Sequence, residues 1–258
     1  MGILNVTPDS FSDGGRHANR DEAVRHAEAM HAAGADLIDI GGESTRPGAP
    51  PVSLDEELDR VVPVVEALRD LDIPLSIDTY KPEMMRAALA AGADMINDIR
   101  AFSEPGAFEA VAQSQCGICA MHMQGDPQTM QQAPNYENVV EEVRTFLSRR
   151  VTALEAAGVA RERIVVDPGF GFGKTTEHNY RLLRDLTLSS PGGLPVLVGM
   201  SRKSMLTAIT GDRPVEARMP ASVAAAVIAA ARGAAIIRVH DVAATVDALK
   251  IWRAVEEN

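Results

Sequence analysis

The chain has 258 residues, a length typical of a single (β/α)8 domain, and no shift in composition marks a linker between two domains. Its formal net charge of −11 argues against nonspecific binding to nucleic acid or to an anionic membrane, because both need a basic surface. No segment reaches the ~20 apolar residues of a membrane span, and no signal peptide opens the chain, so we expect a cytoplasmic protein.

Short apolar runs recur along the chain, and each one ends in, or leads directly to, polar residues. In chain order these polar ends are Asn5, Glu43, Asp78, Asn97 with Asp98, His122, Asp167, Ser201, and Arg238 with His240. The runs are mostly apolar rather than alternating, which is typical of parallel strands buried on both faces. We therefore interpret the eight runs as eight parallel strands.

Segments with helical patterning separate these runs. We expect helices over residues 21–33, 54–71, 82–91, 105–114, 139–157, 176–186, 221–232 and 242–257, and a short extra helix over 204–210. Gly34, Gly92 and Gly158 each stand between a helix and the next strand, where glycine caps a helix in the left-handed conformation. This alternation predicts one TIM barrel over residues 1–258, and an open doubly wound sheet is the competing arrangement.

Long loops follow the first two expected strands. Residues 5–20 are rich in Asp, Ser, Gly and Asn, and residues 43–53 are rich in Pro and Gly. Long loops at strand ends are often binding loops or lids. A plain connector would not need Phe11 or Arg46, so we expect both loops to take part in function.

The polar strand ends meet on one rim if the sheet closes, and that rim carries the active site in TIM barrels. Asp78 and Asp167 can there accept hydrogen bonds from a nitrogen-rich heterocycle or stabilise a developing cation. For Asp78 a second interpretation, a carboxylate that caps the following helix, is equally compatible with the sequence. Asn97 can hydrogen-bond to the donors and acceptors of a ligand through its side-chain amide, or it can stabilise a turn.

Basic residues gather after the seventh and eighth runs, where TIM barrels usually bind phosphate. Ser201, Lys203, Arg238 and His240 would supply donors to a phosphoryl group, and Arg46 could complete the set. A period of two residues puts Arg238 and His240 on the same side of their strand. Asn5 offers a hard oxygen ligand, which alone is a weak indication of Mg²⁺.

Two short motifs have competing interpretations. Residues 169–175 end in Gly-Lys-Thr, but Pro168 stands where a nucleotide-binding P-loop requires glycine. We therefore interpret this segment as a pocket wall in which Phe172 can stack. Cys116 and Cys119 form a Cys-x-x-Cys pair within an apolar run, where buried core residues are favoured over a redox or metal site.

Longer motifs resemble those of one family. Residues 1–15 (MGILNVTPDSFSDGG) and 39–48 (DIGGESTRPG) are similar to the two signatures of dihydropteroate synthases, the folate-pathway enzymes that sulfonamides inhibit. The match continues through Ile77-Asp78-Thr, Ile96-Asn97-Asp98, Met121-His-Met-Gln-Gly125, Asp167-Pro-Gly-Phe-Gly-Phe172-Gly-Lys, Gly199-Met-Ser-Arg-Lys203-Ser and Ile237-Arg238-Val-His240-Asp241. This resemblance covers essentially the whole chain and implies a (β/α)8 barrel that is usually a homodimer.

The resemblance also implies a reaction, in which 4-aminobenzoate is joined to (7,8-dihydropterin-6-yl)methyl diphosphate with release of diphosphate and 7,8-dihydropteroate. It implies that the pterin is held by Asp78, Asn97, Asp167 and Lys203, in a pocket lined by Met121, Phe172 and Gly199. It places the diphosphate against Arg238, His240, Asn5, Thr45 and Arg46, with Asn5 reaching Mg²⁺, and it places the aminobenzoate beside Phe11, Pro47 and Ser201. Family members normally carry a leading segment, whereas this chain starts almost at its first strand.

Two other functions compete with this one. The pterin-binding barrel of corrinoid methyltransferases transfers a methyl group and binds no diphosphate, so Lys203, Arg238 and His240 together argue against it. A non-catalytic pterin-binding paralogue would be expected to lose Asn5 or the pair Thr45-Arg46, and this chain keeps both. Glu43 and His122 are marked only by their position after an apolar run, and this position does not assign them a role.

Overall fold

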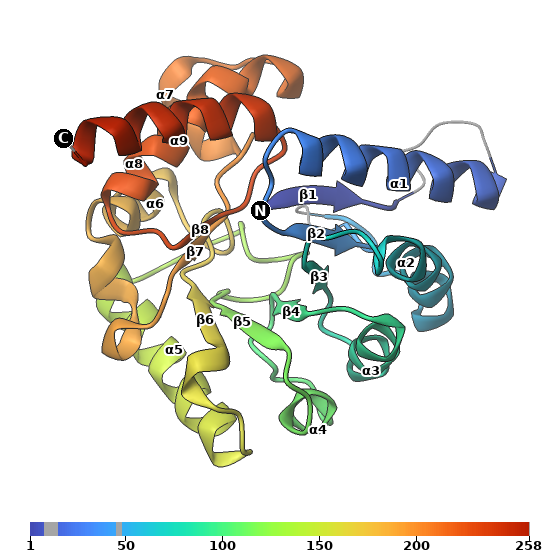
Figure 1. Ribbon diagram of the computed structural model, residues 1–258. Helices are drawn as coiled ribbons and strands as arrows, with labels where there is room; N and C mark the ends of the chain where they lie inside the picture. The colour runs from blue at the N-terminus through green and yellow to red at the C-terminus, as the bar shows by residue number, and fades with distance from the viewer. Residues whose placement is uncertain (8–14, 45–47, 258) are drawn as a thin grey trace.

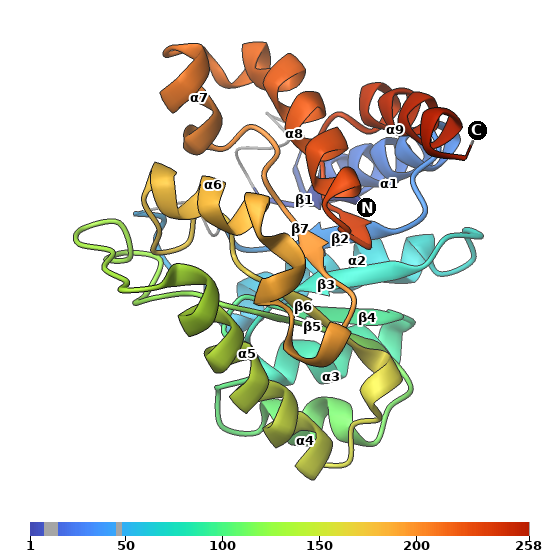
Figure 2. The same ribbon diagram turned by 90° about the vertical axis from the view of Figure 1, so that its left-hand side faces the viewer.

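The structure is a computed structural model that describes residues 1–7, 15–44 and 48–257. Figure 1 shows short strands gathered at the centre with helices around them, and Figure 2 shows the same enclosure from the side. The strands are β1 (Gly2–Asn5), β2 (Ile38–Gly41), β3 (Leu75–Asp78), β4 (Met95–Asp98), β5 (Gly117–Met121), β6 (Ile164–Asp167), β7 (Leu197–Val198) and β8 (Ile236–Ile237). The helices are α1 (Gly15–Ala32), α2 (Leu54–Leu68), α3 (Pro82–Ala91), α4 (Ala107–Ala112), α5 (Val139–Ala156), α6 (Thr176–Arg184), α7 (Ser204–Thr210), α8 (Met219–Ala231) and α9 (Val242–Glu256).

The strands close into a barrel, so the expected (β/α)8 fold is confirmed. Strands β1 to β6 pair in parallel in sequential order, and β7 pairs with β8. Parallel bridges between Val166 and Val196 and between Gly2 and Val239 join the two sheets at both edges. A doubly wound sheet stays open and reverses its strand order, so this closed sequential order contradicts the competing arrangement.

Strand residues alternate between two cores. The strand registers align Leu4, Ile40, Ile77, Ile96 and Ile118, which are 0–1% exposed and pack outward in the large core shared with the helices. Met95, Cys119 and Leu197 form a separate buried cluster. Full burial of one such aliphatic side chain contributes about 1.5–3 kcal/mol, so the outward layer is a large stabilising term.

The first helix begins earlier than the sequence predicted. Helix α1 starts at Gly15, six residues before the expected start at residue 21, so the loop after β1 is shorter than residues 5–20. The first residues of this helix lack apolar periodicity, so the pattern could not reveal them. Helices α3 and α7 match their expected ranges, and the remaining helices differ by one to three residues at an end, where helices fray.

Capping residues explain why several helix boundaries were predicted correctly. Ser53 accepts a hydrogen bond from the backbone N–H of Glu56 (3.3 Å) and so starts α2. Gly92 ends α3 with a φ of 116°, and Gly34 and Gly158 also have positive φ, as their positions before strands predicted. Within the part of the chain that the structure describes, no helix combines the length and hydropathy needed to cross a bilayer.

Candidate active site

A buried ion-pair network lies at the rim formed by the strand ends. Just after β8, the Arg238 guanidinium donates from Nε to Asp39 Oδ2 (2.6 Å) and from Nη2 to Asp78 Oδ2 (3.0 Å). Burial raises the pKa of Asp78 to about 7; the positive charge of Arg238 opposes this rise and the charge of Asp39 adds to it. Asp78 does not cap α3, whose N-cap residue is Lys81, so of its two interpretations the structure favours the rim carboxylate.

Asp39 belongs to this network, and the sequence reasoning missed it. Its Oδ1 accepts from Ser76 Oγ (2.5 Å), and its Oδ2 accepts from Asn97 Nδ2 (3.3 Å) as well as from Arg238. Asp39 stands in the middle of β2 between two isoleucines rather than at a strand end. A carboxylate inside an apolar parallel strand must be paired when buried, and that signal could have identified it.

The two halves of Asn97-Asp98 have different roles. Asn97 is 5% exposed and turns its amide to the carboxylate network inside the barrel. Asp98 accepts hydrogen bonds from the backbone N–H groups of Arg100 (2.7 Å) and Phe102 (2.7 Å) and stabilises a turn in which Phe102 has a φ of 59°. The turn interpretation therefore applies to Asp98, and contact of the Asn97 amide with a ligand stays a prediction.

Asp167 ends β6 and anchors the glycine-rich loop that follows. Its Oδ1 accepts from the backbone N–H of Gly169 (2.7 Å), and burial raises its pKa. Lys174 is 3% exposed and donates to the carbonyls of Gly169 (3.0 Å) and Phe172 (3.0 Å), while its Nζ lies 2.9 Å from His122 Nδ1. Burial lowers the pKa of Lys174 to about 7 and that of His122 to about 2. This lysine therefore ties its own loop to β5, in agreement with our rejection of a P-loop.

The glycine-rich loop approaches the end of β5 very closely. A Cβ added to Gly169, whose φ is +71°, would lie 1.8 Å from the carbonyl oxygen of His122. Only glycine fits this position, so the loop path behind Asp167 depends on it.

One wall of the site is apolar and carries a lysine. Phe172 packs with Met121 in a small buried cluster, and Lys203 Nζ lies 4.4 Å from the Phe172 ring centroid. The same Nζ donates to the carbonyl of Phe170 (2.5 Å). Burial lowers the pKa of Lys203 to about 8, although the charge of Asp167 acts to raise it. The structure therefore brings these predicted pocket residues together.

The predicted phosphate-binding residues separate into two groups. Ser201 Oγ accepts from the backbone N–H of His240 (3.2 Å) and lies 3.0 Å from His240 Nδ1, so these two residues meet in the loops after β7 and β8. Arg238 instead faces the carboxylates, and Gly199 leaves space beside it, since a Cβ on Gly199 would lie 3.9 Å from Arg238 Cβ. Arg238 therefore belongs to the carboxylate network.

Asn5 and Asp78 end the strands on either side of Gly41. A Cβ added to Gly41, which pairs with both in the sheet, would lie 3.8 Å from Asn5 Oδ1 and 3.9 Å from Asp78 Oδ2. No group of three His, Cys, Asp or Glu gathers as a metal site among residues 1–7, 15–44 and 48–257. A single amide oxygen fits Mg²⁺, which takes few protein ligands and completes its shell with water and substrate phosphate.

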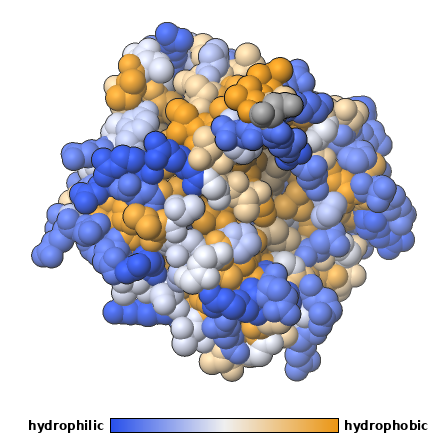
Figure 3. Space-filling model, turned by 60° about the vertical axis from the view of Figure 1, so that its left-hand side comes forward, coloured by the Kyte–Doolittle hydropathy of each residue, from blue (hydrophilic) through white to orange (hydrophobic). Residues whose placement is uncertain are grey.

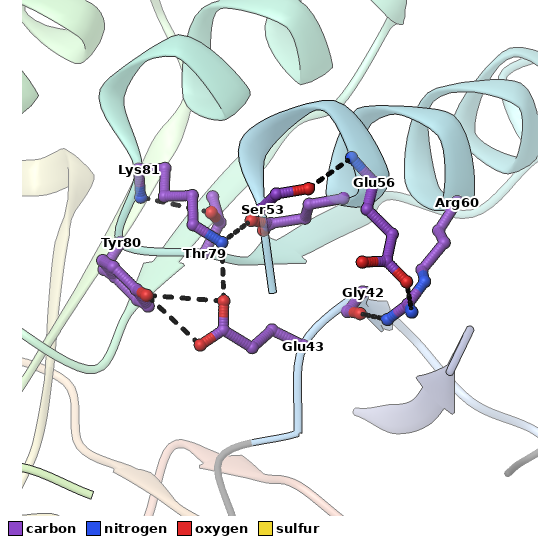
Figure 4. Close-up of polar contacts among 9 residues, drawn as sticks. Gly42, Glu43, Ser53, Glu56, Arg60, Thr79, Tyr80 and Lys81 are labelled. Carbon is purple, nitrogen blue, oxygen red and sulfur yellow. Dashed lines mark hydrogen bonds and ion pairs between the residues drawn. The ribbon is translucent and has the colours of Figure 1, made fainter. Parts of the chain in front are cut away.

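Glu43 anchors the start of the second loop. Lys81 Nζ, at the N-cap of α3, bonds to Glu43 Oε2 (2.6 Å) and to Glu57 Oε2 of α2 (2.5 Å), and the Tyr80 hydroxyl donates to Glu43 Oε1 (3.2 Å). Figure 4 shows these contacts converging on the stem of the loop. Glu43 is thus explained by a structural role. Phe11, Thr45, Arg46 and Pro47 lie outside the described residues.

The two cysteines are free and buried, and they lie in different parts of the core. Cys116 packs with the helices, and its Sγ accepts from Ser114 Oγ (3.0 Å), whereas Cys119 belongs to the interior cluster of the barrel. Burial raises the pKa of Cys119 well above its ordinary value, which keeps it a thiol. This arrangement agrees with the core interpretation.

A cavity of about 530 Å³ lies at the opposite, N-terminal end of the strands. Leu37, Met95, Gly117 and Ile236, from the beginnings of strands, contribute to its lining, and none of the carboxylates Asp39, Asp78 and Asp167 does. Catalytic groups of TIM barrels lie at the C-terminal rim, so this cavity is not the candidate active site.

Comparison with known proteins agrees with the rim geometry. The chain matches the family described as pterin binding enzyme over residues 1–240. It is 54% identical over 255 residues to the dihydropteroate synthase of Escherichia coli (strain K12), which covers 98% of this chain and 90% of that protein.

Two solved structures are similar to the chain over nearly its whole length. The dihydropteroate synthase of Burkholderia cenocepacia complexed with 7,8-dihydropteroate is 61% identical with a TM-score of 0.92, and the match covers 99% of this chain and 90% of that chain. The enzyme of Xanthomonas albilineans with 4-aminobenzoic acid is 54% identical with a TM-score of 0.93, covering 99% and 92% respectively.

Proposed function

The chain belongs to the family of pterin-binding enzymes, and we infer from this premise and from the site that it catalyses the dihydropteroate synthase reaction. It condenses (7,8-dihydropterin-6-yl)methyl diphosphate with 4-aminobenzoate and releases diphosphate and 7,8-dihydropteroate, a step of tetrahydrofolate biosynthesis. One observation carries this conclusion: Asp78, Asn97, Asp167, Lys203 and Arg238 all converge at the rim of one barrel.

We propose that the carboxylates and the amide bind the pterin. A pterin presents several N–H donors and acceptors along one edge, and buried carboxylates bind such donors strongly. Asp78 and Asp167 would accept hydrogen bonds from the ring. Asn97 would both donate and accept a hydrogen bond through its amide, and Lys203 would donate to the ring oxygen. Met121 and Phe172 would pack against the ring through apolar contact.

The same carboxylates can assist the chemical step. The C–O bond to diphosphate breaks, a C–N bond to the aromatic amine forms, and the amine loses a proton. If cleavage runs ahead of attack, positive charge develops on the pterin methylene, and the fixed charges of Asp78 and Asp167 in a water-poor site stabilise it. The amine is a neutral nucleophile, so no strong base is needed. Ser201 and His240, with Asn5, Thr45 and Arg46, would hold the diphosphate, and Phe11 and Pro47 would border the aminobenzoate.

Mg²⁺ is the cofactor that we propose for this reaction. When bound, it would neutralise charge on the departing diphosphate. Asn5 Oδ1 would be its protein ligand. EDTA should abolish turnover, added Mg²⁺ should restore it, and Asn5→Ala should raise the Mg²⁺ concentration needed for half-maximal rate. Full activity in EDTA would contradict this cofactor.

We also propose a cytoplasmic homodimer. Buried free thiols suit a reducing compartment. Ile228 of α8 and Ile251 and Val255 of α9 are 48–71% exposed, and Figure 3 shows hydrophobic patches between hydrophilic side chains on one face. A second copy of the chain could cover such residues. Light scattering after size-exclusion chromatography tests this, and a mass near 27.5 kDa would contradict it.

One assay separates the function from its competitors. Diphosphate release should require both the pterin diphosphate and 4-aminobenzoate, and the product should be 7,8-dihydropteroate. Pterin binding without diphosphate release would instead indicate a non-catalytic pterin-binding protein. Methyl transfer from methyltetrahydrofolate to a corrinoid would indicate the methyltransferase.

A further inference from the structure

A strained arginine stands between two residues of the site. Arg202 has a φ of 60°, in the left-handed region that favours glycine, and its neighbours are Ser201 and Lys203. The backbone N–H of Lys203 donates to the carbonyl of Met200 (3.2 Å), which closes a four-residue turn with Arg202 in its third position. Glycine is the usual residue at the third position of a turn with positive φ. An arginine in this place requires compensating contacts.

The Arg202 side chain joins the loop after β7 to the loop after β8. Its Nε donates to Asp241 Oδ2 (3.0 Å) and its Nη2 donates to Asp241 Oδ1 (2.6 Å). The two side chains are 27% and 14% exposed, so solvent screens this pair only in part. A two-pronged arginine–carboxylate pair fixes orientation as well as distance. Asp241 follows His240 directly, so the pair fixes the end of the β8 loop that carries the histidine.

The backbone of Arg202 is held as firmly as its side chain. Its N–H donates to Ser222 Oγ of α8 (2.9 Å), and its carbonyl accepts from Arg218 Nη1 (3.0 Å). Ser222 is 2% exposed and its hydroxyl donates in turn to the carbonyl of Arg218 (2.9 Å). The backbone N–H and carbonyl of Arg202, and its side-chain Nε and Nη2, are thus bonded to Asp241 after β8 and to residues at the start of α8. Strain that persists under such contacts commonly marks a functional position.

We propose that Arg202, through its pair with Asp241, is a positioning residue that sets Ser201 against His240 and directs Lys203 into the pterin pocket. Glycine would satisfy the turn, but it would provide no tether between the two loops. The contacts that depend on this tether are Ser201 Oγ to His240 Nδ1 (3.0 Å) and Lys203 Nζ to the carbonyl of Phe170 (2.5 Å). This inference rests on the proposed function, because it concerns the same reaction.

The experiment compares Arg202→Gly, Asp241→Asn and a control, Arg144→Ala. Glycine keeps the turn and removes the tether, so Arg202→Gly should keep the wild-type far-UV circular dichroism and melt cooperatively. Its kcat/KM for the pterin diphosphate should fall about 10- to 100-fold, as expected when a catalytic group is displaced by about 1 Å. Asp241→Asn should show a smaller fall. Arg144 pairs with Glu141 on the exposed face of α5, and its variant should keep wild-type kinetics.

Chemical rescue separates positioning from a merely structural role. Millimolar guanidinium, at a concentration that leaves wild-type activity unchanged, should restore part of the activity of Arg202→Gly by occupying the space beside Asp241, and should restore none in Asp241→Asn. Wild-type kinetics in Arg202→Gly would overturn the inference, and so would a loss that tracks a lower melting temperature and resists rescue. Absence of product with the wild-type protein would instead refute the proposed function.

Discussion

Replacement of Asp78 by asparagine should stabilise the protein and impair its activity at the same time. The Asp78 side chain is 10% exposed, and burial raises its pKa from 3.8 to about 7 even though it bonds to Arg238. The raised pKa means that the folded state disfavours the charged form. Asparagine has nearly the same shape and removes the charge, and Arg238 keeps its bond to Asp39.

The size of the gain follows from proton linkage. Because the folded-state pKa lies above the unfolded value, the folded wild-type protein binds more protons between pH 3.8 and 7, and its stability falls as pH rises through this window. Three pKa units at 1.36 kcal/mol each give about 4 kcal/mol as an upper value above pH 7. At pH 5 the same reasoning gives about 2 kcal/mol, and well below pH 3.8 the gain vanishes.

Urea unfolding followed by circular dichroism at pH 5 and pH 8 measures both gains. The free energy of unfolding of Asp78→Asn should exceed that of the wild type by more at pH 8 than at pH 5. Asp126→Asn, at a side chain that is 69% exposed, is the control and should change little at either pH. In the same preparations kcat/KM for the pterin diphosphate should fall about 10- to 100-fold, because a charged acceptor is lost. A variant that is less stable at pH 8, or a gain independent of pH, would refute the reasoning.

Three further predictions test other parts of the site. Asp167→Asn should lower kcat about 10²- to 10³-fold while leaving the circular dichroism spectrum unchanged, and near-wild-type turnover would remove Asp167 from the mechanism. Cys116 and Cys119 should react with a thiol reagent only after unfolding, and rapid labelling of the native protein would contradict their burial. Gly169→Ala should unfold or inactivate the enzyme, whereas Gly193→Ala, with a similar φ of +69° but no neighbour within 4 Å of the new Cβ, should cost only about 1 kcal/mol in unfolding experiments.

Most of the fold could be predicted because its signals are local. Apolar runs and glycine caps mark the strands and the ends of helices, and βα alternation then predicts parallel strands. The start of α1 was missed because its first residues carry no apolar stripe, and a helix without such a stripe leaves no periodic signal. The competition between a closed and an open sheet was decided by two bridges, Gly2 to Val239 and Val166 to Val196, which join distant parts of the chain.

The site was predicted less completely, and the reason is again physical. Position at a strand end identified Asp78, Asp167 and Arg238, because parallel strands bring their ends to one rim. The same rule also marked Glu43 and His122, which the structure uses to hold loops. Strand-end position shows where a side chain lies along the barrel axis, but only the packed neighbours decide whether it faces a ligand or the protein.

Asp39 was missed because it lies inside β2, whereas the sequence rule considers only residues at strand ends. Asp39 receives bonds from Ser76, Asn97 and Arg238, whereas Asp78 shares only Arg238 among these donors. The two carboxylates thus share one guanidinium, and Asp39 has two further hydrogen-bond donors, Ser76 and Asn97, that Asp78 lacks. Asp78 is left as an under-paired carboxylate whose cost in stability persists until a ligand brings donors to it. If Asp78 accepts hydrogen bonds from the N–H edge of the pterin, as we propose, substrate binding recovers the stability that the folded protein loses at Asp78.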